Sequence, residues 1–293
     1  MRMSPWSLLA LPLILGGCRT ARETPTSSEA QAAKPRVDCG PAIPGMEAVL
    51  KPGAFVVLGE MHGTQEAPLF ASRLACHAAK AGQTVRLALE LPVEEQARLD
   101  VWLAKEDGAS WDFTDSAFWR REVQDGRSSE AMKQLLERAR DWRHAGLPLR
   151  VVAFDTGGKE RDTTMAEHLR QARSEAPRDT FIVLVGNLHA RRDVGAPWNK
   201  SLEFMTHRLL ATEPGLVSLD LAYPGGSAWI CRGMTADTCG EKPLRGTSVD
   251  RPPGISLQKD ADDPDGYDGT YSVGTLSASP PALGASTATS APK

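Results

Sequence analysis

An apolar run in the sequence ends in two residues that together could transfer a proton. In VVLGEMHG (residues 56–63) the apolar stretch ends at Gly59, and Glu60 and His62 follow with one residue between them. Polar groups removed from water need partners, so a core strand gains no stability from such an ending. A carboxylate beside an imidazole suits acid–base chemistry at neutral pH, because histidine has an ordinary pKa of about 6.5.

Three further apolar runs end in polar residues. LALE ends in Glu90, VVAFD ends in Asp155, and the run 180–185 leads into GNLH, which contains Asn187 and His189. Alone, each has a structural interpretation: Glu60 as an acid at a helix N-terminus, Asp155 as a loop cap, or His189 as a hydrogen-bonded structural histidine. Four such endings in one chain favour a common site.

The elements that would position these residues follow from the apolar runs, which are continuous rather than alternating. This pattern is typical of strands covered on both faces. The expected strands are 54–58, 85–89, 149–154, 180–185 and 216–221, and the expected helices are about 66–80, 93–105, 129–145, 160–174 and 200–211. The alternation predicts an α/β fold with a mostly parallel central sheet and helices on both faces.

Parallel strands end at one edge of their sheet, where α/β proteins bind ligands. One concave pocket should therefore be lined by Glu60, His62, Glu90, Asp155 and His189. Residues 106–128 exceed an ordinary connection and contain four large aromatic side chains. We expect this segment to form a small helical cap over one edge of the sheet.

The two ends of the chain differ in composition from its middle. Residues 1–17 combine a basic start with an apolar stretch of signal-peptide length, and LGGC resembles a bacterial lipobox that would make Cys18 a lipid-bearing N-terminus. An ordinary signal peptide with Cys18 unmodified is the alternative. Residues 18–38 indicate a flexible tether, and residues 246–293 indicate a disordered low-complexity tail. The folded domain is therefore expected at 39–245.

Export predicts a place in the bacterial cell envelope, at the outer membrane facing the periplasm, with the lipid as the only contact with the membrane. The net charge of −3 and the pI of about 6.1 provide no basic field for nucleic acid. An oxidising compartment favours disulfides. Cys231 and Cys239 flank a turn-rich stretch and are the preferred pair, which leaves Cys39 with Cys76.

Taken in order, the motifs resemble those of the superfamily that contains the erythromycin esterase-like proteins, the haem-binding uptake lipoprotein ChaN and the Tiki/TraB proteins. The stretches that carry the resemblance are GEMHGTQE (59–66), LALELP (87–92), VVAFD (151–155), RDTTMAEHL (161–169) and GNLHARRDVGAPW (186–198). The single residue between Glu60 and His62 matches the ChaN form. The short segment 91–148 disfavours a macrolide-sized substrate.

The preferred hypothesis is a hydrolase that acts on a small-molecule or peptide substrate by direct attack of water, because the sequence contains no GxSxG elbow. His62 is the expected general base, Glu60 or Glu90 would orient its ring, and His189 would face it as a second base, an acid or an electrostatic stabiliser. The expected binding residues are Asp155, Arg161, Arg127 and Asn187. Since a strand-end imidazole buries little apolar area, loss of His62 should remove function with little loss of stability.

This hypothesis requires no cofactor, and two alternatives require one. A Tiki-like metal-dependent protease would hold zinc, manganese or cobalt with Glu60, His62, Glu90 and His189. The resemblance to ChaN implies instead an uptake lipoprotein that binds haem or a metal without catalysis.

Overall fold

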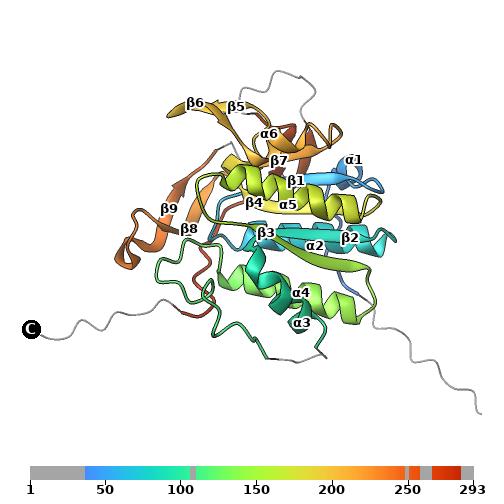
Figure 1. Ribbon diagram of the computed structural model, residues 1–293, viewed down its shortest axis with the longest axis horizontal. Helices are drawn as coiled ribbons and strands as arrows, with labels where there is room; N and C mark the ends of the chain where they lie inside the picture. Colours follow the sequence, from blue (N-terminus) through green and yellow to red (C-terminus); the bar gives the residue numbers. More distant parts are fainter. Residues whose placement is uncertain (1–36, 106–109, 248–250, 258–265, 285–293) are drawn as a thin grey trace, which may run out of the picture. The chain divides into compact units, whose positions relative to one another are not determined.

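The continuous apolar runs form the middle of a seven-stranded sheet (Figure 1). The strands expected from the sequence are β1 (Phe55–Glu60), β2 (Val85–Pro92), β3 (Leu149–Asp155), β4 (Thr180–Gly186) and β7 (Val217–Ala222). Two further strands, β10 (Gly254–Leu257) and β11 (Gly269–Ser272), complete the order β10-β11-β7-β1-β4-β2-β3. All neighbouring pairs are parallel except β10 with β11, so the strands that precede the predicted site residues end at one edge.

This computed structural model describes residues 37–105, 110–247, 251–257 and 266–284. The predicted signal peptide, Cys18 and all but the last two residues of the predicted tether lie outside the described residues. None of the described helices is long and apolar enough to cross a membrane.

Helices cover both faces of the sheet, as the sequence predicts (Figure 1). One face packs against α2 (Glu66–Lys80), α3 (Gln96–Leu103) and α4 (Glu130–His144), and the other packs against α5 (Arg161–Glu175) and α6 (Met205–Leu209). Side chains alternate along a strand, so β1 sends Val56 and Leu58 into the first core and Phe55 and Val57 into the second. Burial on both faces explains why its apolar run is continuous. Two short helices, α1 (Met46–Val49) and η1 (Val93–Glu95), lie before β1 and α3.

The segment 106–128 is not a helical cap in its described part, residues 110–128, which contains turns and no helix. Aromatic packing holds it in place instead. The Trp111 ring lies 4.4 Å from Phe113, 4.8 Å from Trp119 and 5.2 Å from Trp102 of α3, measured between ring centroids. Such a cluster buries enough apolar surface to fix a connection whose backbone forms no regular element.

The prediction of a disordered tail at 246–293 is wrong for its described residues. β10 and β11 extend the sheet beyond β7, and Tyr267 and Tyr271 are buried. The composition predicted disorder because the segment has few apolar side chains. Several of these few, among them Tyr267, Tyr271 and Leu276, nevertheless pack in the two cores, and the backbone of the segment pairs in the sheet. The folded unit therefore continues past residue 245 to at least residue 284.

Two antiparallel hairpins flank the carboxyl edge of the sheet (Figure 1). The first, β5 (Val194–Ala196) with β6 (Asn199–Glu203), replaces the start of the helix expected at 200–211. The second joins β8 (Gly225–Cys231) to β9 (Cys239–Arg245), and places Cys231 opposite Cys239. Both predicted disulfides are confirmed: the Cα atoms lie 3.8 Å apart in Cys231–Cys239 and 5.5 Å apart in Cys39–Cys76.

Candidate active site

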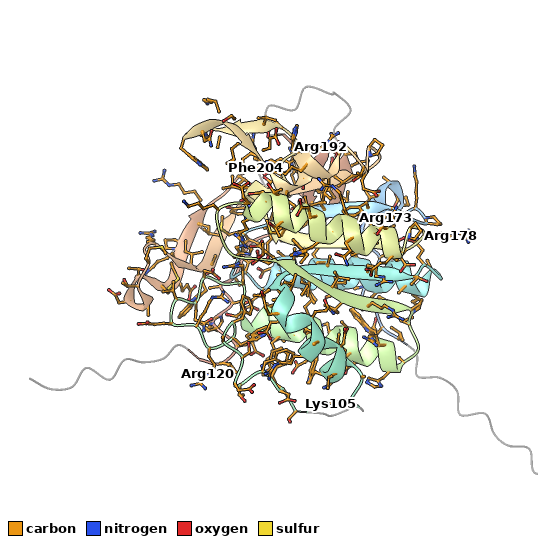
Figure 2. The ribbon with its side chains drawn as sticks, viewed as in Figure 1. Lys105, Arg120, Arg173, Arg178, Arg192 and Phe204 are labelled. Carbon is orange, nitrogen blue, oxygen red and sulfur yellow. A yellow bond between two sulfur atoms is a disulfide. The ribbon has the colours of Figure 1, made fainter. Side chains whose placement is uncertain are left out.

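Side chains from three strand ends, those of β1, β2 and β4, meet in one pocket of about 340 Å³. Its lining includes every predicted catalytic residue and three predicted binding residues: Glu60, His62, Glu90, His189, Arg127, Arg161 and Asn187. Asp155, the eighth, lies beside the pocket and bonds to both arginines. Of the five strand-end residues expected to line one pocket, four line it and Asp155 does not. The opposite edge of the sheet lies on the side of Arg178 in Figure 2.

His62 lies between two carboxylates. Its Nδ1 donates to Oε1 of Glu60 over 2.9 Å, and its Nε2 is 3.4 Å from Oε2 of Glu90. Both glutamates are buried at the ends of β1 and β2. Gly186, at the end of β4, leaves room for the ring, because a Cβ there would lie 2.9 Å from Nε2. The glycine of the GNLH stretch is therefore needed for the histidine of the first motif to fit.

This arrangement makes His62 a cation at neutral pH. Burial disfavours the charged ring, but the charge of Glu90 and the hydrogen bonds to Glu60 and Glu90 outweigh that cost and raise the pKa of His62 to about 10. The sequence-based expectation of an ordinary pKa, and with it a free base at pH 7, does not match this geometry. A protonated imidazole can donate a proton or stabilise negative charge, but it cannot accept a proton.

Glu90 is the central acceptor of the site. Its Oε2 receives the backbone N–H of Gly186 at 2.7 Å, and its Oε1 bonds to Arg161 and lies 3.5 Å from Nη1 of Arg127. Burial would favour the neutral acid, but the charge and hydrogen bond of His62, with the charge of Arg161, hold the pKa of Glu90 well below its usual range. The carboxylate therefore stays ionised and fixes three neighbouring groups.

Asp155, beside the pocket, bonds to both Arg127 and Arg161. Arg127 Nη1 donates to Oδ2 of Asp155 over 2.6 Å, and Arg161 Nε donates to Oδ1 over 2.7 Å. Arg127 also bonds to Asp125, 2.7 Å from its Nη2. Burial lowers the pKa of Arg161, but its bond to Asp155 and the charges of Glu90 and Asp155 raise it further above its usual value. Both guanidinium groups are held as cations at the pocket wall.

His189 has the geometry of a neutral base. Its Nδ1 donates to Oδ1 of Asp162 over 2.8 Å, and its Nε2 accepts a hydrogen bond from Nη1 of Arg161 over 3.2 Å. An arginine can only donate, so the ring proton sits on Nδ1 and the lone pair of Nε2 is turned toward Arg161. The backbone N–H of Met205, the first residue of α6, also donates to Oδ1 of Asp162 and fixes that carboxylate.

Four residues of this neighbourhood were missed from the sequence. Asp125 and Asp162 lie close in the chain to the predicted residues Arg127 and Arg161. The short stretches DGR (125–127) and RD (161–162), each with a carboxylate near an arginine, were the available signal. Tyr267 donates to the carbonyl of Asn187 over 2.8 Å, and Tyr271 donates to the carbonyl of Gly59 over 2.9 Å. No local signal marks these tyrosines, because they reach the site only through the fold of the segment taken for a tail.

The donor set does not fit a divalent metal. No group of three or more His, Cys, Asp or Glu in the described parts of the chain is arranged to hold a metal ion. Among the four predicted ligands, both nitrogens of His62 face carboxylates, and Nε2 of His189 faces a guanidinium. These atoms satisfy one another instead of pointing to a common centre.

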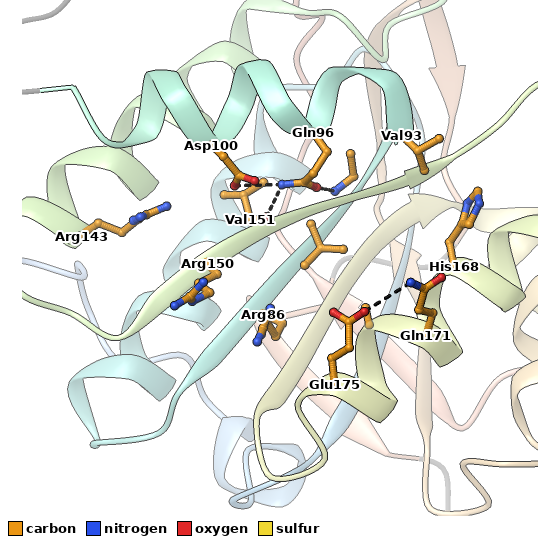
Figure 3. Close-up of a pocket in the computed structure, with 13 residues that line it drawn as sticks. Arg86, Val93, Gln96, Asp100, Arg143, Arg150, Val151, His168, Gln171 and Glu175 are labelled. Carbon is orange, nitrogen blue, oxygen red and sulfur yellow. Dashed lines mark hydrogen bonds between the residues drawn. The ribbon is translucent and has the colours of Figure 1, made fainter.

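A larger hollow of about 530 Å³ lies along β3, away from the strand ends (Figure 3). Its lining contains none of the predicted site residues. The side chain of Gln96 bonds to the carbonyl of Val151 and to the N–H of Ala153, so it occupies the outer edge of β3. Gln96 thus serves the fold here, and the candidate site is the smaller pocket, where the predicted residues lie.

No family model and no curated protein matches the sequence. Solved structures are similar, among them a succinoglycan biosynthesis protein with a TM-score of 0.59 and 10% identity, covering 84% of this chain and 95% of that one. A protein from Bacillus cereus has a TM-score of 0.56 and 11% identity, and the match covers 80% of this chain and 91% of that one. A variant of the erythromycin esterase EreC in its open conformation has a TM-score of 0.53 and 11% identity, and the match covers 68% of this chain and 78% of that one.

At these identities the likeness concerns the fold alone. The chain has the fold of erythromycin esterase, which confirms at the level of architecture the resemblance that the motifs carry.

Proposed function

We propose that this protein is a hydrolase that cleaves an ester or amide by direct attack of water. The observation that carries the proposal is a single pocket with two histidines in opposite states: His62 charged between Glu60 and Glu90, and His189 neutral on Asp162. Acid–base catalysis needs one group that accepts a proton and one that is already charged. One neighbour in fold is named an erythromycin esterase, which supports an ester as the first substrate to test.

His189 is the group we propose as the base. The lone pair of its Nε2 accepts from Arg161 in the resting site, so water would take the place of the guanidinium there while Arg161 turns to the substrate oxygen. Asp162 stabilises the ring once it is protonated. Water would attack the carbonyl carbon and give its proton to Nε2, and the same proton would pass to the leaving group when the scissile bond breaks. Arg161 and Arg127, with His62, would stabilise the negative oxygen of the tetrahedral intermediate.

The expectations of haem binding, of a place in the cell envelope and of a lipid on Cys18 stay proposals. A haem-binding role would require His62 or His189 to release a present partner before a nitrogen could ligate iron. We propose further that the substrate is a small molecule or peptide met in the bacterial cell envelope, with the protein held by a lipid on Cys18. Mass spectrometry of the mature N-terminus tests that point, because an unmodified Cys18 would contradict it.

The hydrolase proposal is tested with nitrophenyl esters and anilides as substrates. We expect His189→Ala to lower kcat/KM by about 10²–10⁴, while His144→Ala, which alters the end of α4, leaves it unchanged. The pH profile assigns the roles: the rate should fall as the pH approaches 10, because His62 loses its proton. A rate that rises through pH 10 would make His62 the base. Turnover that is indifferent to both histidines would refute the site.

A further inference from the structure

A second pocket opens directly beside the candidate active site. It has a volume of about 490 Å³ and is formed by the β5–β6 hairpin and the turn after β4. Leu188 lines both this pocket and the site pocket, and it precedes the proposed base His189 in the chain. A ligand that enters at His189 can therefore continue over Leu188 into the second pocket.

The second pocket presents apolar side chains to solvent. Three of the seven large apolar side chains exposed in the described part of the chain line it: Leu188, Val194 and Trp198, with 41%, 45% and 67% of their surface exposed. Phe204, labelled in Figure 2, and Ala196 also line this pocket and are buried. Scattered exposed apolar residues are ordinary, but a cluster lining a hollow marks a binding surface.

Two of the three charged side chains that line this pocket, Arg191 and Asp193, are paired with each other, and Lys200 is the third. Arg191 bonds to Asp193 with Nε 2.9 Å from Oδ1 and Nη2 2.5 Å from Oδ2. Its guanidinium lies 5.8 Å from the centroid of the Phe204 ring, so it also covers an aromatic face. A polar ligand that binds to Arg191 or Asp193 would have to break this ion pair, whereas an apolar chain or ring can lie against Trp198 and Val194 without doing so.

We propose that this second pocket is the subsite for the apolar part of the substrate, so that the substrate is an ester or amide of a medium-chain acyl or aryl group. The inference rests on the proposed function: the scissile carbonyl lies in the site pocket against His189 and Arg161, and the chain or ring extends over Leu188 onto Trp198. A pocket of this volume is of the size that holds small organic ligands. Trp198 is a specificity-determining residue and takes no part in the reaction itself.

The test is the chain-length dependence of hydrolysis. With nitrophenyl acetate, butyrate, hexanoate and octanoate, kcat/KM of the wild-type protein should rise at least about tenfold, since each buried methylene is worth up to about fourfold. Trp198→Ala should remove the rise of kcat/KM with chain length and leave kcat/KM for the acetate ester unchanged. Trp198→Phe should largely restore the rise. Met234→Ala is the matched control, because Met234 is 90% exposed on the other hairpin and lines neither pocket.

A binding measurement separates the subsite from the catalysis. By isothermal titration, octanoate should bind at least about tenfold more tightly than acetate, in wild type and in His189→Ala alike, and Trp198→Ala should remove the difference. A flat series in the wild type, or octanoate binding indifferent to Trp198→Ala, overturns the subsite even if esters are cleaved. If octanoate binding depends on Trp198 but no ester is cleaved, the subsite stands and the hydrolase proposal fails.

Discussion

His62 shows how one side chain stabilises the fold and also defines the chemistry of the pocket. Its ring separates the buried carboxylates of Glu60 and Glu90, which would otherwise repel each other without a cation between them. The expectation from sequence was that its loss would spare stability, because an imidazole at a strand end buries little apolar area. The geometry reverses that expectation, since removing one partner leaves buried charge uncompensated.

His62→Gln should therefore lower the free energy of unfolding by about 3 kcal/mol at pH 7, a size typical of a broken buried ion pair. The folded pKa of His62 is raised to about 10, so its stabilising effect is complete below the unfolded pKa of about 6.5 and is lost as pH rises toward 10. Urea denaturation of both proteins from pH 6 to 10 measures this. A difference that does not shrink with rising pH would contradict the charged state of His62.

At the scale of the element, β3 is the outer strand of the sheet on its far side from β10. Outer strands offer backbone groups to which another chain can bind. The side chain of Gln96, at the start of α3, takes the place of a neighbouring strand: its Oε1 accepts the N–H of Ala153 at 2.7 Å, and its Nε2 donates to the carbonyl of Val151 at 3.2 Å (Figure 3). One glutamine thus covers the part of the edge nearest α3.

Gln96→Ala should cost about 1–3 kcal/mol, because it leaves backbone groups of β3 without partners. The same change should promote self-association through the freed edge. Chemical denaturation and sedimentation velocity measure the two effects. Gln171→Ala is the control in the same hollow, since Gln171 bonds only to exposed Glu175 on α5 among the described contacts. An unchanged stability would show that water replaces the glutamine at no cost.

For the whole molecule, the C-terminal segment ties the site loops together. Tyr271 bonds to Gly59 in β1, Tyr267 bonds to Asn187 after β4, and the N–H of Ser279 donates to the carbonyl of Gly63 over 2.8 Å. Residues 277–281 also bond to the loop after β1 and to the start of α4. The loops that carry Glu60, His62 and His189 are thus held from one side by the chain's last described residues.

Tyr271→Phe should lower the free energy of unfolding by about 1 kcal/mol, because it keeps the buried ring and deletes one hydrogen bond. It should also lower any activity that depends on His62, since Gly59 precedes Glu60. Tyr223→Phe is the control, because Tyr223 is buried too but none of the described hydrogen bonds involves its hydroxyl. Equal losses in both variants would show that the Tyr271 hydroxyl contributes nothing particular.

The sequence by itself determined the elements whose signal is local. The apolar runs predict five strands because burial on both faces imposes an unbroken apolar stretch. The ends of three of them are marked by the carboxylates Glu60, Glu90 and Asp155. From this the meeting of Glu60, His62, Glu90, Asp155 and His189 at one edge follows by topology, since parallel strands all end on the same side. The two disulfides were predicted from the expected export to an oxidising compartment and from the spacing of four cysteines.

Tertiary structure alone decided what depends on partners distant in the chain. The pKa of His62 is raised by Glu90, 28 positions away, and the tautomer of His189 is set by Asp162 and Arg161 on α5, the helix before β4. The strands β10 and β11 are too polar to be recognised from composition, and become strands because β7 offers them a free edge. Such features arise from Coulomb energy and backbone pairing across space, which the local order of residues does not contain.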